Sequence, residues 1–301
     1  MRPRRSELAT PASNRAMIER AAQSDADLVF LDLEDAVAPN RKDEARENVV
    51  WAYTELDWGG KTRAVRVNAV DSEHAYRDVI EIVEGVGGSL DVVIVPKVRS
   101  ADDVRFVATL LHQLELRLRL PEPIAMEVLI EDVSALIHVD AIAHATPRLE
   151  ALIFGPGDFA ASQGVDASLL TEDREHWAYA RSRVVVAARA AGVDAVDGPF
   201  DRFREPELYL GEARRAQAMG FAGKWAIHPS QIPLANEVFS PDADSVHRAR
   251  EIVTAYREAT ERGEGAIVYE DKMLDAAAIR PLEERLRRAE EIERRFGSAA
   301  G

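Results

Sequence analysis

Eight short apolar or β-rich segments recur between residues 6 and 229, and segments with helical spacing of apolar residues separate them. Their ranges are 6–11, 28–36, 62–69, 92–98, 124–130, 151–158, 195–200 and 223–229. Regular alternation of strand and helix builds a parallel sheet covered by helices. Eight repeats favour a closed barrel over an open doubly wound sheet, which usually stops at about five to seven strands. We therefore predict an α/β fold, a (β/α)8 TIM barrel with a C-terminal helical extension.

The extension begins where the alternation ends. From Pro241 onward the chain reads as helix, first in SVHRAREIVTAYREATERGEG and then in IVYEDKMLDAAAIRPLEERLRRAEEIERRF, with many opposite charges four residues apart. We predict a catalytic barrel at residues 1–240 and a helical extension at residues 241–301. Such an extension can cover the mouth of its own barrel or that of a neighbouring subunit, and the pattern allows both.

Charge and residue content exclude several classes of function. With 38 Lys and Arg against 53 Asp and Glu, the formal net charge of −15 disfavours binding to nucleic acid or to an anionic membrane. The chain has no cysteine, which rules out disulfides, thiolate catalysis and zinc–sulfur sites. No stretch has the character of a signal peptide or a membrane span, so we expect a cytoplasmic protein. Glycine-rich dinucleotide and Walker phosphate motifs are also missing after the strands.

Polar residues close most of the apolar segments. They are Glu34 and Asp35 after the second segment, Arg66 and Asn68 in the third, Lys97 in the fourth, Glu127 in the fifth, Asp158 after the sixth, Asp197 in the seventh and His228 in the eighth. Catalytic groups of a (β/α)8 barrel gather at the carboxyl ends of its strands, so we expect these side chains to meet at one rim. A single acid there is ordinarily a helix cap or a loop ion pair, whereas several acids together indicate a bound cation.

The type of ligand favours one kind of metal. Carboxylates without a His-x-His or His-x3-His pair favour Mg²⁺, with Mn²⁺ as the other possibility, over zinc. Mg²⁺ needs only one or two carboxylates and keeps places for water or a bidentate α-keto acid. Glu127 lies inside the apolar run IAMEVLI and Asp158 ends ALIFGPGD, where an unpaired carboxylate is costly. We predict these two residues as the metal ligands.

The motifs of the chain resemble those of a known family. FLDLEDAVAP, VRVNAVDS, VVIVPKV, AMEVLIED, FGPGDFAAS, VDGPF and GKWAIHPSQ are similar to segments of the citrate lyase β-subunit and HpcH/HpaI aldolase family. The resemblance runs from about Arg5 to the region of Asp275 and is strongest to the malyl-CoA and β-methylmalyl-CoA lyase branch. It implies that Glu127 and Asp158 hold Mg²⁺ beside a glyoxylate-like oxo acid and the enolate of an acyl-CoA thioester.

The resemblance also implies roles for other residues. Arg66 is expected at the thioester carbonyl, where a permanent positive charge can stabilise the oxygen of an enolate; the alternative is an ion pair with Glu34 or Asp35. These two acids are expected around the waters of the metal. Backbone amides at Gly157 and Asp158 are expected to receive the carboxylate of the oxo acid. Lys97 and His228 match family positions and are interpreted as supporting groups that contact the substrate.

A general base is implied by the resemblance of EGAIVYEDKMLDAAAIR to the carboxyl-terminal segment of malyl-CoA lyases. Asp275 matches the aspartate that is thought to act as the base in a neighbouring subunit, and its alternative is an acid in the first turn of a helix. This role implies a homo-oligomer, a trimer or a hexamer, because one chain would lack a complete site.

The chain departs from the family at the coenzyme A loop. Thr10 to Asn14 replace a Gly-Pro-Gly-Ser-Arg-like run, and Ala9 stands where an aromatic residue is expected. Arg15 or Arg20 could contact the coenzyme phosphates instead, although such an arginine is often only solvated. The segment after GDFAAS is also shorter than in typical relatives.

We predict a Mg²⁺-dependent carbon–carbon lyase that cleaves (S)-malyl-CoA or β-methylmalyl-CoA to glyoxylate and acetyl-CoA or propionyl-CoA, and condenses them in reverse. Asp275, Arg66, Glu34 and Asp35 are the predicted catalytic residues. Three alternatives remain: a citramalyl-CoA or citryl-CoA lyase, a malyl-CoA thioesterase, and a non-catalytic homologue that binds a CoA ligand. The CoA thioester and the oxo acid are the expected partners.

Overall fold

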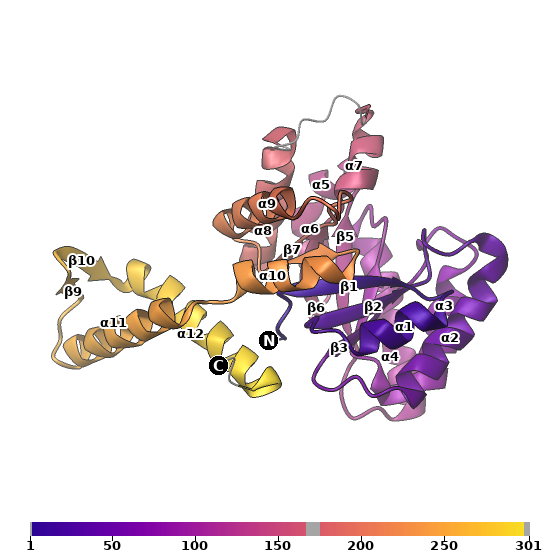
Figure 1. Ribbon diagram of the computed structural model, residues 1–301, viewed down its shortest axis with the longest axis horizontal. Coiled ribbons are helices and arrows are strands. Elements are labelled where there is room, and N and C mark those ends of the chain that lie inside the picture. The colour runs from indigo at the N-terminus through magenta and orange to yellow at the C-terminus, as the bar shows by residue number, and fades with distance from the viewer. Residues whose placement is uncertain (1, 167–174, 298–301) are drawn as a thin grey trace. The chain divides into compact units, whose positions relative to one another are not determined.

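The computed structural model describes residues 2–166 and 175–297, and its larger part is a closed barrel of eight parallel strands (Figure 1). The strands are β1 (Ser6–Pro11), β2 (Leu28–Asp32), β3 (Thr62–Arg66), β4 (Val92–Val95), β5 (Ala125–Ile130), β6 (Leu149–Phe154), β7 (Asp194–Asp197) and β8 (Gly223–Ala226). Each pairs with its neighbour in chain order, and β8 closes on β1. The predicted (β/α)8 barrel is confirmed.

Helices follow the strands and surround them. They are α1 (Arg15–Ala22), α2 (Lys42–Glu55), α3 (Ala75–Val86), α4 (Ala101–Leu118), α5 (Val133–Ile137), α6 (Val139–Ala143), α7 (Pro156–Gln163), α8 (Ala178–Ala191), α9 (Pro206–Met219) and α10 (Ile232–Phe239). Local signals set their starts: Ser100 and Asp103 form a capping box at α4, and Asn14 caps α1. In the described part of the chain, no helix is both long and apolar enough to cross a lipid bilayer.

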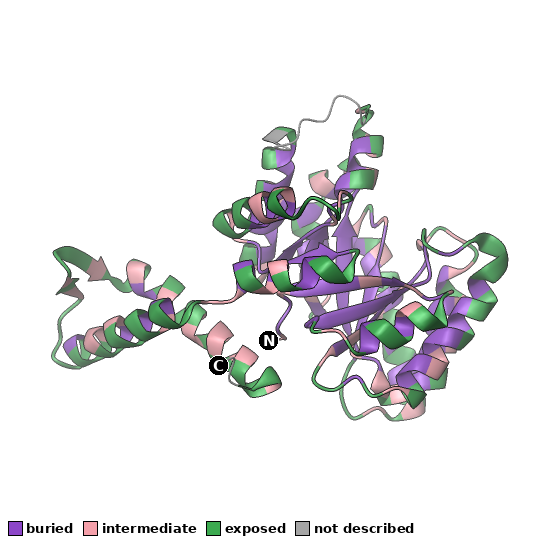
Figure 2. Cartoon of the chain, viewed as in Figure 1, coloured by how far each residue is buried: buried purple, intermediate pink, exposed green. Residues whose placement is uncertain are grey.

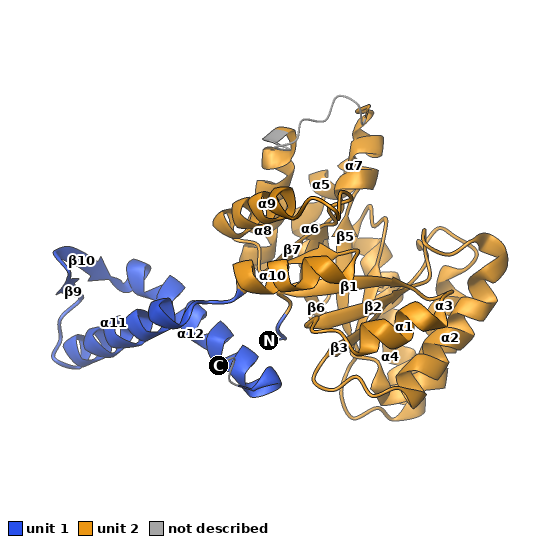
Figure 3. Cartoon of the chain, viewed as in Figure 1, with its two compact units in different colours: residues 1–3, 240–301 blue, residues 4–239 orange. Residues whose placement is uncertain are grey.

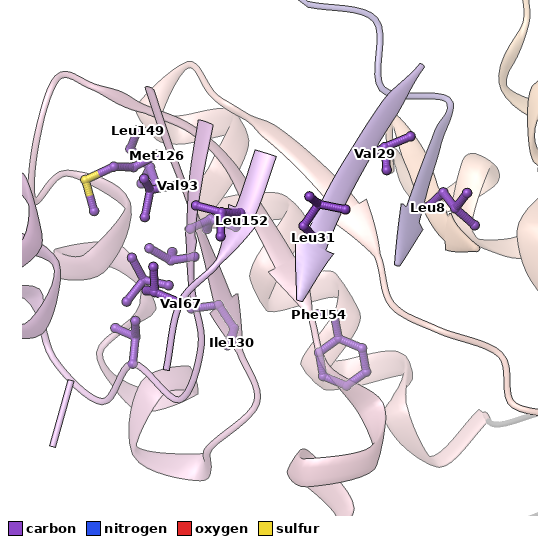
Figure 4. Packing of buried hydrophobic residues seen from close by; sticks show 14 of the residues in the cluster. Leu8, Val29, Leu31, Val67, Val93, Met126, Ile130, Leu149, Leu152 and Phe154 are labelled. Carbon is purple, nitrogen blue, oxygen red and sulfur yellow. The ribbon is translucent and has the colours of Figure 1, made fainter. Parts of the chain in front are cut away.

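Alternation along the strands separates two apolar layers. On β2, Leu28 and Phe30 belong to a small cluster built from strand residues only, which fills the barrel interior. Val29 and Leu31 belong to a large cluster that also includes the buried faces of the helices. Figure 2 shows the barrel strands as buried, and Figure 4 shows part of the large cluster. The polar residues at, or just after, the carboxyl ends of the strands therefore line the barrel mouth.

The chain divides into two compact units, Arg4–Phe239 and Ser240–Gly301, with Met1–Pro3 assigned to the second (Figure 3). The division lies one residue from the boundary proposed from the sequence. The second unit contains α11 (Ala243–Glu261), β9 (Ala266–Tyr269), β10 (Lys272–Asp275) and α12 (Ala276–Phe296).

The two short strands of this unit correct the sequence analysis, which predicted helix through them. β9 and β10 pair antiparallel around Glu270 and Asp271, whose φ angles are 44° and 60°. Positive φ at both central residues is what a two-residue hairpin turn with right-handed strand twist requires. The charged pair in the turn hides this signal, because Asn-Gly or Asp-Gly is the usual sequence there.

Candidate active site at the barrel rim

The last residues of β2 and β3 begin a charged cluster at the carboxyl end of the barrel. Asp32 and Arg66 are register partners, and the guanidinium donates from Nε to Oδ1 and from Nη2 to Oδ2, both at 2.7 Å. Burial would raise the pKa of Asp32, but the hydrogen bonds and charge of Arg66 hold it below its ordinary value. Asp32 was not predicted as a site residue.

Glu34 lies between two cations. Its Oε2 is 3.0 Å from Arg66 Nη1, and its Oε1 is 2.7 Å from Lys97 Nζ. Burial raises the pKa of Glu34 in spite of both positive charges. Asp35 is exposed and accepts hydrogen bonds from Lys97 Nζ at 3.0 and 3.2 Å. The structure therefore brings these four predicted residues together, and the ion pair considered as the alternative role of Arg66 is present.

A buried lysine on α2 fixes the backbone that carries Glu34. Lys42 Nζ donates to the carbonyls of Leu33 and Glu34 at 2.6 and 2.8 Å, and to Asn68 Oδ1 at 2.7 Å. Asn68 Nδ2 donates in turn to Asp78 at 2.6 Å. Asn68 thus supports the backbone of the rim through α2 and α3.

Glu131, the residue after β5, is the main site residue that the sequence analysis missed. Its side chain is buried, and its Oε1 accepts a hydrogen bond from the backbone N–H of Lys97 at 2.7 Å. Lys97 adopts a φ of 51°, which a residue other than glycine rarely takes and which is common at functional sites. Burial raises the pKa of Glu131 to about 8, with a further contribution from the negative charges of Glu34 and Asp158.

Gly155 makes room for Glu131. A Cβ at Gly155 would lie 2.6 Å from both Cβ and Oε2 of Glu131, although the φ of Gly155, −96°, is open to any residue. Only glycine therefore fits against this carboxylate. Gly157, the glycine predicted to matter, has open space around it.

Asp158 lies in the first turn of α7, where Pro156 occupies the first position. Helix geometry leaves the N–H groups of Gly157 and Asp158 without partners inside the helix, and the helix dipole adds positive potential there. The side chain of Asp158 is half-buried and acts electrostatically on Glu131. Among the described residues, neither Glu131 nor Asp158 is ion-paired with Arg, Lys or His.

These two acids suit a hard dication. Within the described part of the chain, no group of three or more His, Asp or Glu side chains is arranged to hold a metal. A site of two carboxylates completed by water or ligand oxygens is typical of Mg²⁺ and atypical of a closed zinc site. The Glu131 carboxyl, seated against Gly155, has a raised pKa, which fits a cation that replaces the proton on that carboxyl.

Glu127 is not part of this group, which corrects its prediction as a metal ligand. It lies four residues before Glu131 on the same face of β5, which is ~13 Å along a strand. There it is fully buried and pairs with Arg4, which also contacts Glu150 and Asp194 at 3.0 and 3.1 Å. The inward alternation from Glu127 through Leu129 was the signal that could have identified Glu131, because the next inward position is at the rim.

Other predicted residues lie around the mouth or apart from it. Arg20 and His228 line one pocket of about 270 Å³ together with residues of β1 and α1, and the His228 ring stacks on Phe203 with 4.7 Å between centroids. Asp197 faces the helix layer, where it pairs with Arg181 and Lys224, so it is not at the mouth. This corrects the expectation that it joins the rim.

Asp275 belongs to the second unit. It ends β10 and caps α12, accepting hydrogen bonds from the N–H groups of Ala277 and Ala278 at 3.0 and 3.2 Å. Its carboxylate is exposed. The alternative reading, an acid at a helix start, therefore describes its local contacts, and a catalytic role for it stays a prediction.

Comparisons with known proteins found a matching family model, similar curated proteins and similar solved structures. Residues 5–229 match the family model described as HpcH/HpaI aldolase/citrate lyase. The chain is 43% identical to an L-malyl-CoA/beta-methylmalyl-CoA lyase of Cereibacter sphaeroides, over 97% of this chain and 96% of that protein. It is 32% identical to the mitochondrial citramalyl-CoA lyase of Homo sapiens, over 92% of this chain and 83% of that protein. The solved structure of CitE from Mycobacterium tuberculosis in complex with magnesium, acetoacetate and coenzyme A superposes with a TM-score of 0.75 at 30% identity, over 95% of this chain and 97% of that chain.

Proposed function

The chain belongs to the HpcH/HpaI aldolase/citrate lyase family, and from this premise we propose that it is a Mg²⁺-dependent carbon–carbon lyase acting on CoA thioesters. Its substrate is (S)-malyl-CoA or β-methylmalyl-CoA, and its products are glyoxylate and acetyl-CoA or propionyl-CoA. The reaction is reversible. The 43% identical relative from Cereibacter sphaeroides, which is named for both substrates, supports this choice.

One observation carries the proposal: Glu131 and Asp158 act electrostatically on each other at the rim, and among the described residues neither forms an ion pair with Arg, Lys or His. Every other rim acid is ion-paired with Arg66 or Lys97. Two carboxylates beside a buried surface are costly when both are ionised, unless a cation joins them. Glu131 and Asp158 would hold the Mg²⁺ ion, and Mn²⁺ has the same preference for oxygen ligands.

Mg²⁺ bound there would supply a positive charge that polarises the α-oxo acid. Arg66 supplies the second positive charge. Of its five N–H donors, Asp32 takes two, and Nη1 lies 3.0 Å from Glu34 in an ion pair, so donors remain for an oxygen of the substrate. The surrounding acids hold the pKa of Arg66 above its ordinary value despite burial, so it remains charged and can stabilise the oxygen of a thioester enolate.

Cleavage requires two proton movements. A base takes the proton from the hydroxyl of malyl-CoA, the bond between the carbinol carbon and the methylene carbon breaks, and glyoxylate leaves. The enolate of acetyl-CoA then takes up a proton at that methylene carbon. Asp275 is the proposed acid–base group, supplied by a neighbouring subunit of a trimer or hexamer. Its exposed carboxylate at a helix start is available for this task.

The remaining predicted residues are assigned to binding. The N–H groups of Gly157 and Asp158 would receive the carboxylate of the oxo acid at the start of α7. Arg20 and His228, which share a pocket beside β1 and α1, would contact the coenzyme. Thr10, the first residue of the altered Thr10–Asn14 segment, also lines this pocket.

A citramalyl-CoA lyase is the second candidate function, and the human relative named for that activity favours it. The two activities differ by one methyl group on the carbinol carbon. The same metal ligands and the same arginine serve both, so the pocket beside them determines the choice.

Purified protein incubated with malyl-CoA, β-methylmalyl-CoA and citramalyl-CoA, with Mg²⁺ or with a chelator, tests the proposal. We expect glyoxylate and an acyl-CoA without free coenzyme A, and only with the metal. Release of pyruvate from citramalyl-CoA, without cleavage of the other two thioesters, would favour the second candidate. Free coenzyme A with malate would indicate a thioesterase, and no product from any substrate would indicate a binding protein.

A further inference from the structure

Four charged side chains are buried together between the barrel wall and its helices. Lys224 of β8, Asp197 of β7, Arg181 of α8 and Glu212 of α9 are each at most 4% exposed. Lys224 Nζ donates to Asp197 at 2.6 Å and to Glu212 at 2.7 Å, and Arg181 lies 3.0 Å from Asp197 and 3.1 Å from Glu212. We call these residues the buried quartet. The formal charges of its four side chains sum to zero.

Stability alone is a poor explanation for the quartet. Desolvation of buried ion pairs can outweigh their attraction, and apolar residues of similar size are often as stabilising. The proposed mechanism uses none of the four. A buried network of this kind is better understood through what it holds in place.

The quartet holds the backbone of Gly198, the residue after β7. The third donor of Lys224 Nζ is used for the carbonyl of Gly198, at 2.7 Å. An ammonium has three N–H groups, and here they join two acids and one main-chain carbonyl. No apolar side chain could make the bond to Gly198.

Gly198 presses against the turn that carries Asp158. A Cβ at Gly198 would lie 2.1 Å from the carbonyl oxygen of Phe154 and 2.5 Å from Cδ of Pro156. Phe154 ends β6, and Pro156 begins α7 two residues before Asp158. Gly198 therefore limits how far this turn can move toward β7.

Arg181 reaches the same turn by a second route. Its guanidinium carbon lies 5.8 Å from the centre of the Phe154 ring, and that ring is 5.3 Å from the ring of Phe159. Phe159 follows Asp158 directly in α7. Arg181 thus contacts the turn directly through Phe154, and Lys224 acts on it through Gly198.

We propose that the buried quartet is a positioning device for Asp158, with Lys224 as its central residue. It fixes the start of α7 through Gly198 and Phe154, so that the carboxylate of Asp158 stays beside Glu131. This inference rests on the proposed function only in treating Asp158 as a metal ligand. Lys224 touches no reacting atom and acts through the backbone.

The Lys224→Met variant tests the proposal through metal binding without substrate. The protein is titrated with Mn²⁺, and the free ion is measured by electron paramagnetic resonance. Loss of a group that orients a metal ligand typically weakens binding by ~10–100-fold, and we expect the Mn²⁺ dissociation constant to rise by about tenfold or more. Removal of a positive charge would by itself strengthen cation binding, so weaker binding reports geometry.

A charge-balanced variant separates positioning from stability. Lys224→Met with Glu212→Gln removes one positive and one negative charge, and Arg181 still pairs with Asp197. We expect the melting temperature to recover toward that of the wild type while Mn²⁺ binding stays weak, because the carbonyl of Gly198 is still released. Arg148→Met is the matched control, since it removes a pair with Glu115 at the other end of β6. It should lower stability without changing Mn²⁺ binding.

The outcomes distinguish this proposal from the proposed function. Asp158→Ala provides the reference for lost binding. If the wild type binds Mn²⁺ and both Lys224 variants bind it equally well, the positioning role is refuted and the metal site stands. Recovery of Mn²⁺ binding together with stability in the double variant would also refute it. A wild type that binds no Mn²⁺, or an Asp158→Ala variant that binds normally, would overturn the metal assignment and this proposal with it.

Discussion

Replacing Glu131 by glutamine should stabilise the metal-free protein and abolish its response to Mg²⁺. The pKa of Glu131 rises to about 8 because the carboxyl is buried next to the negative charges of Glu34 and Asp158. At low pH the carboxyl is protonated in the folded and the unfolded chain, and it makes no difference to stability. Between its ordinary pKa and about 8, the folded protein keeps a proton that the unfolded chain has lost. The free energy of unfolding therefore falls as the pH rises through this range.

The size of the effect follows from the shift. A rise from 4.5 to about 8 corresponds, at about 1.4 kcal/mol per pH unit, to on the order of 5 kcal/mol for carrying the charge in the folded state. Relaxation and water entry reduce this value, so Glu131→Gln should gain a few kcal/mol at pH 8.5. In a domain of this size that is roughly 5 °C in melting temperature. Near pH 4.5 the two proteins should melt alike.

Thermal unfolding with and without Mg²⁺ measures both halves of the prediction. Saturating metal should raise the melting temperature of the wild type, since a ligand at 100 times its dissociation constant adds about 2.7 kcal/mol. Glu131→Gln should show no such rise. Glu127→Gln is the matched control, because Glu127 lies on the same face of β5 but pairs with Arg4, and it should keep the full response to Mg²⁺. A metal response lost in Glu127→Gln and kept in Glu131→Gln would refute the reasoning.

Three further substitutions test other parts of the site. Gly155→Ala should weaken Mg²⁺ binding by about tenfold or more, because the new Cβ would occupy the place of Glu131. Gly157→Ala is the control and should bind Mg²⁺ normally in the absence of substrate. Equal Mg²⁺ dissociation constants for the two variants would contradict this. Arg66→Lys should lower kcat by about 100-fold and leave the fold intact, because an ammonium cannot make both hydrogen bonds to Asp32 and still face the substrate. Unchanged turnover would remove Arg66 from the mechanism. Mixing inactive Asp275→Ala and Arg66→Ala chains should restore part of the activity if one site draws on two subunits, and failure to recover would indicate a site within one chain.

Much of the fold was predictable because the signals are local and repeated. Each of the eight strands is a short apolar run between amphipathic segments, and β1 and β8 begin at the predicted residues. The hairpin of β9 and β10 was missed for a physical reason. Its strands are four residues each and its apolar residues are spaced as they would be on a helix, so only the backbone of Glu270 and Asp271 reveals the turn.

The site was predicted less completely, because position along a strand matters more than membership in it. Arg66, Glu34, Asp35 and Lys97 meet at the rim as their place after the strands suggests. Glu127 was chosen over Glu131 because it interrupts a hydrophobic run, which makes it conspicuous in the sequence. Burial of a charge shows only that it has a partner, and the partner of Glu127 is Arg4, distant in sequence. No local pattern identifies such a contact.

The acids of the rim differ in what neutralises them, and this difference leads to a last prediction. Asp32 and Glu34 are ion-paired with Arg66, and Lys97 is shared between Glu34 and Asp35. Among the described residues Glu131 forms no such ion pair and, with a pKa of about 8, carries a proton at neutral pH. Metal binding must displace that proton, because only the carboxylate can coordinate. We expect release of ~0.9 proton per Mg²⁺ at pH 7 and of ~0.1 at pH 9, from a single titration at that pKa. Calorimetric titrations in buffers of different ionisation enthalpy measure this number. A binding enthalpy independent of buffer at pH 7 would mean that Glu131 is already ionised, or that the metal binds elsewhere.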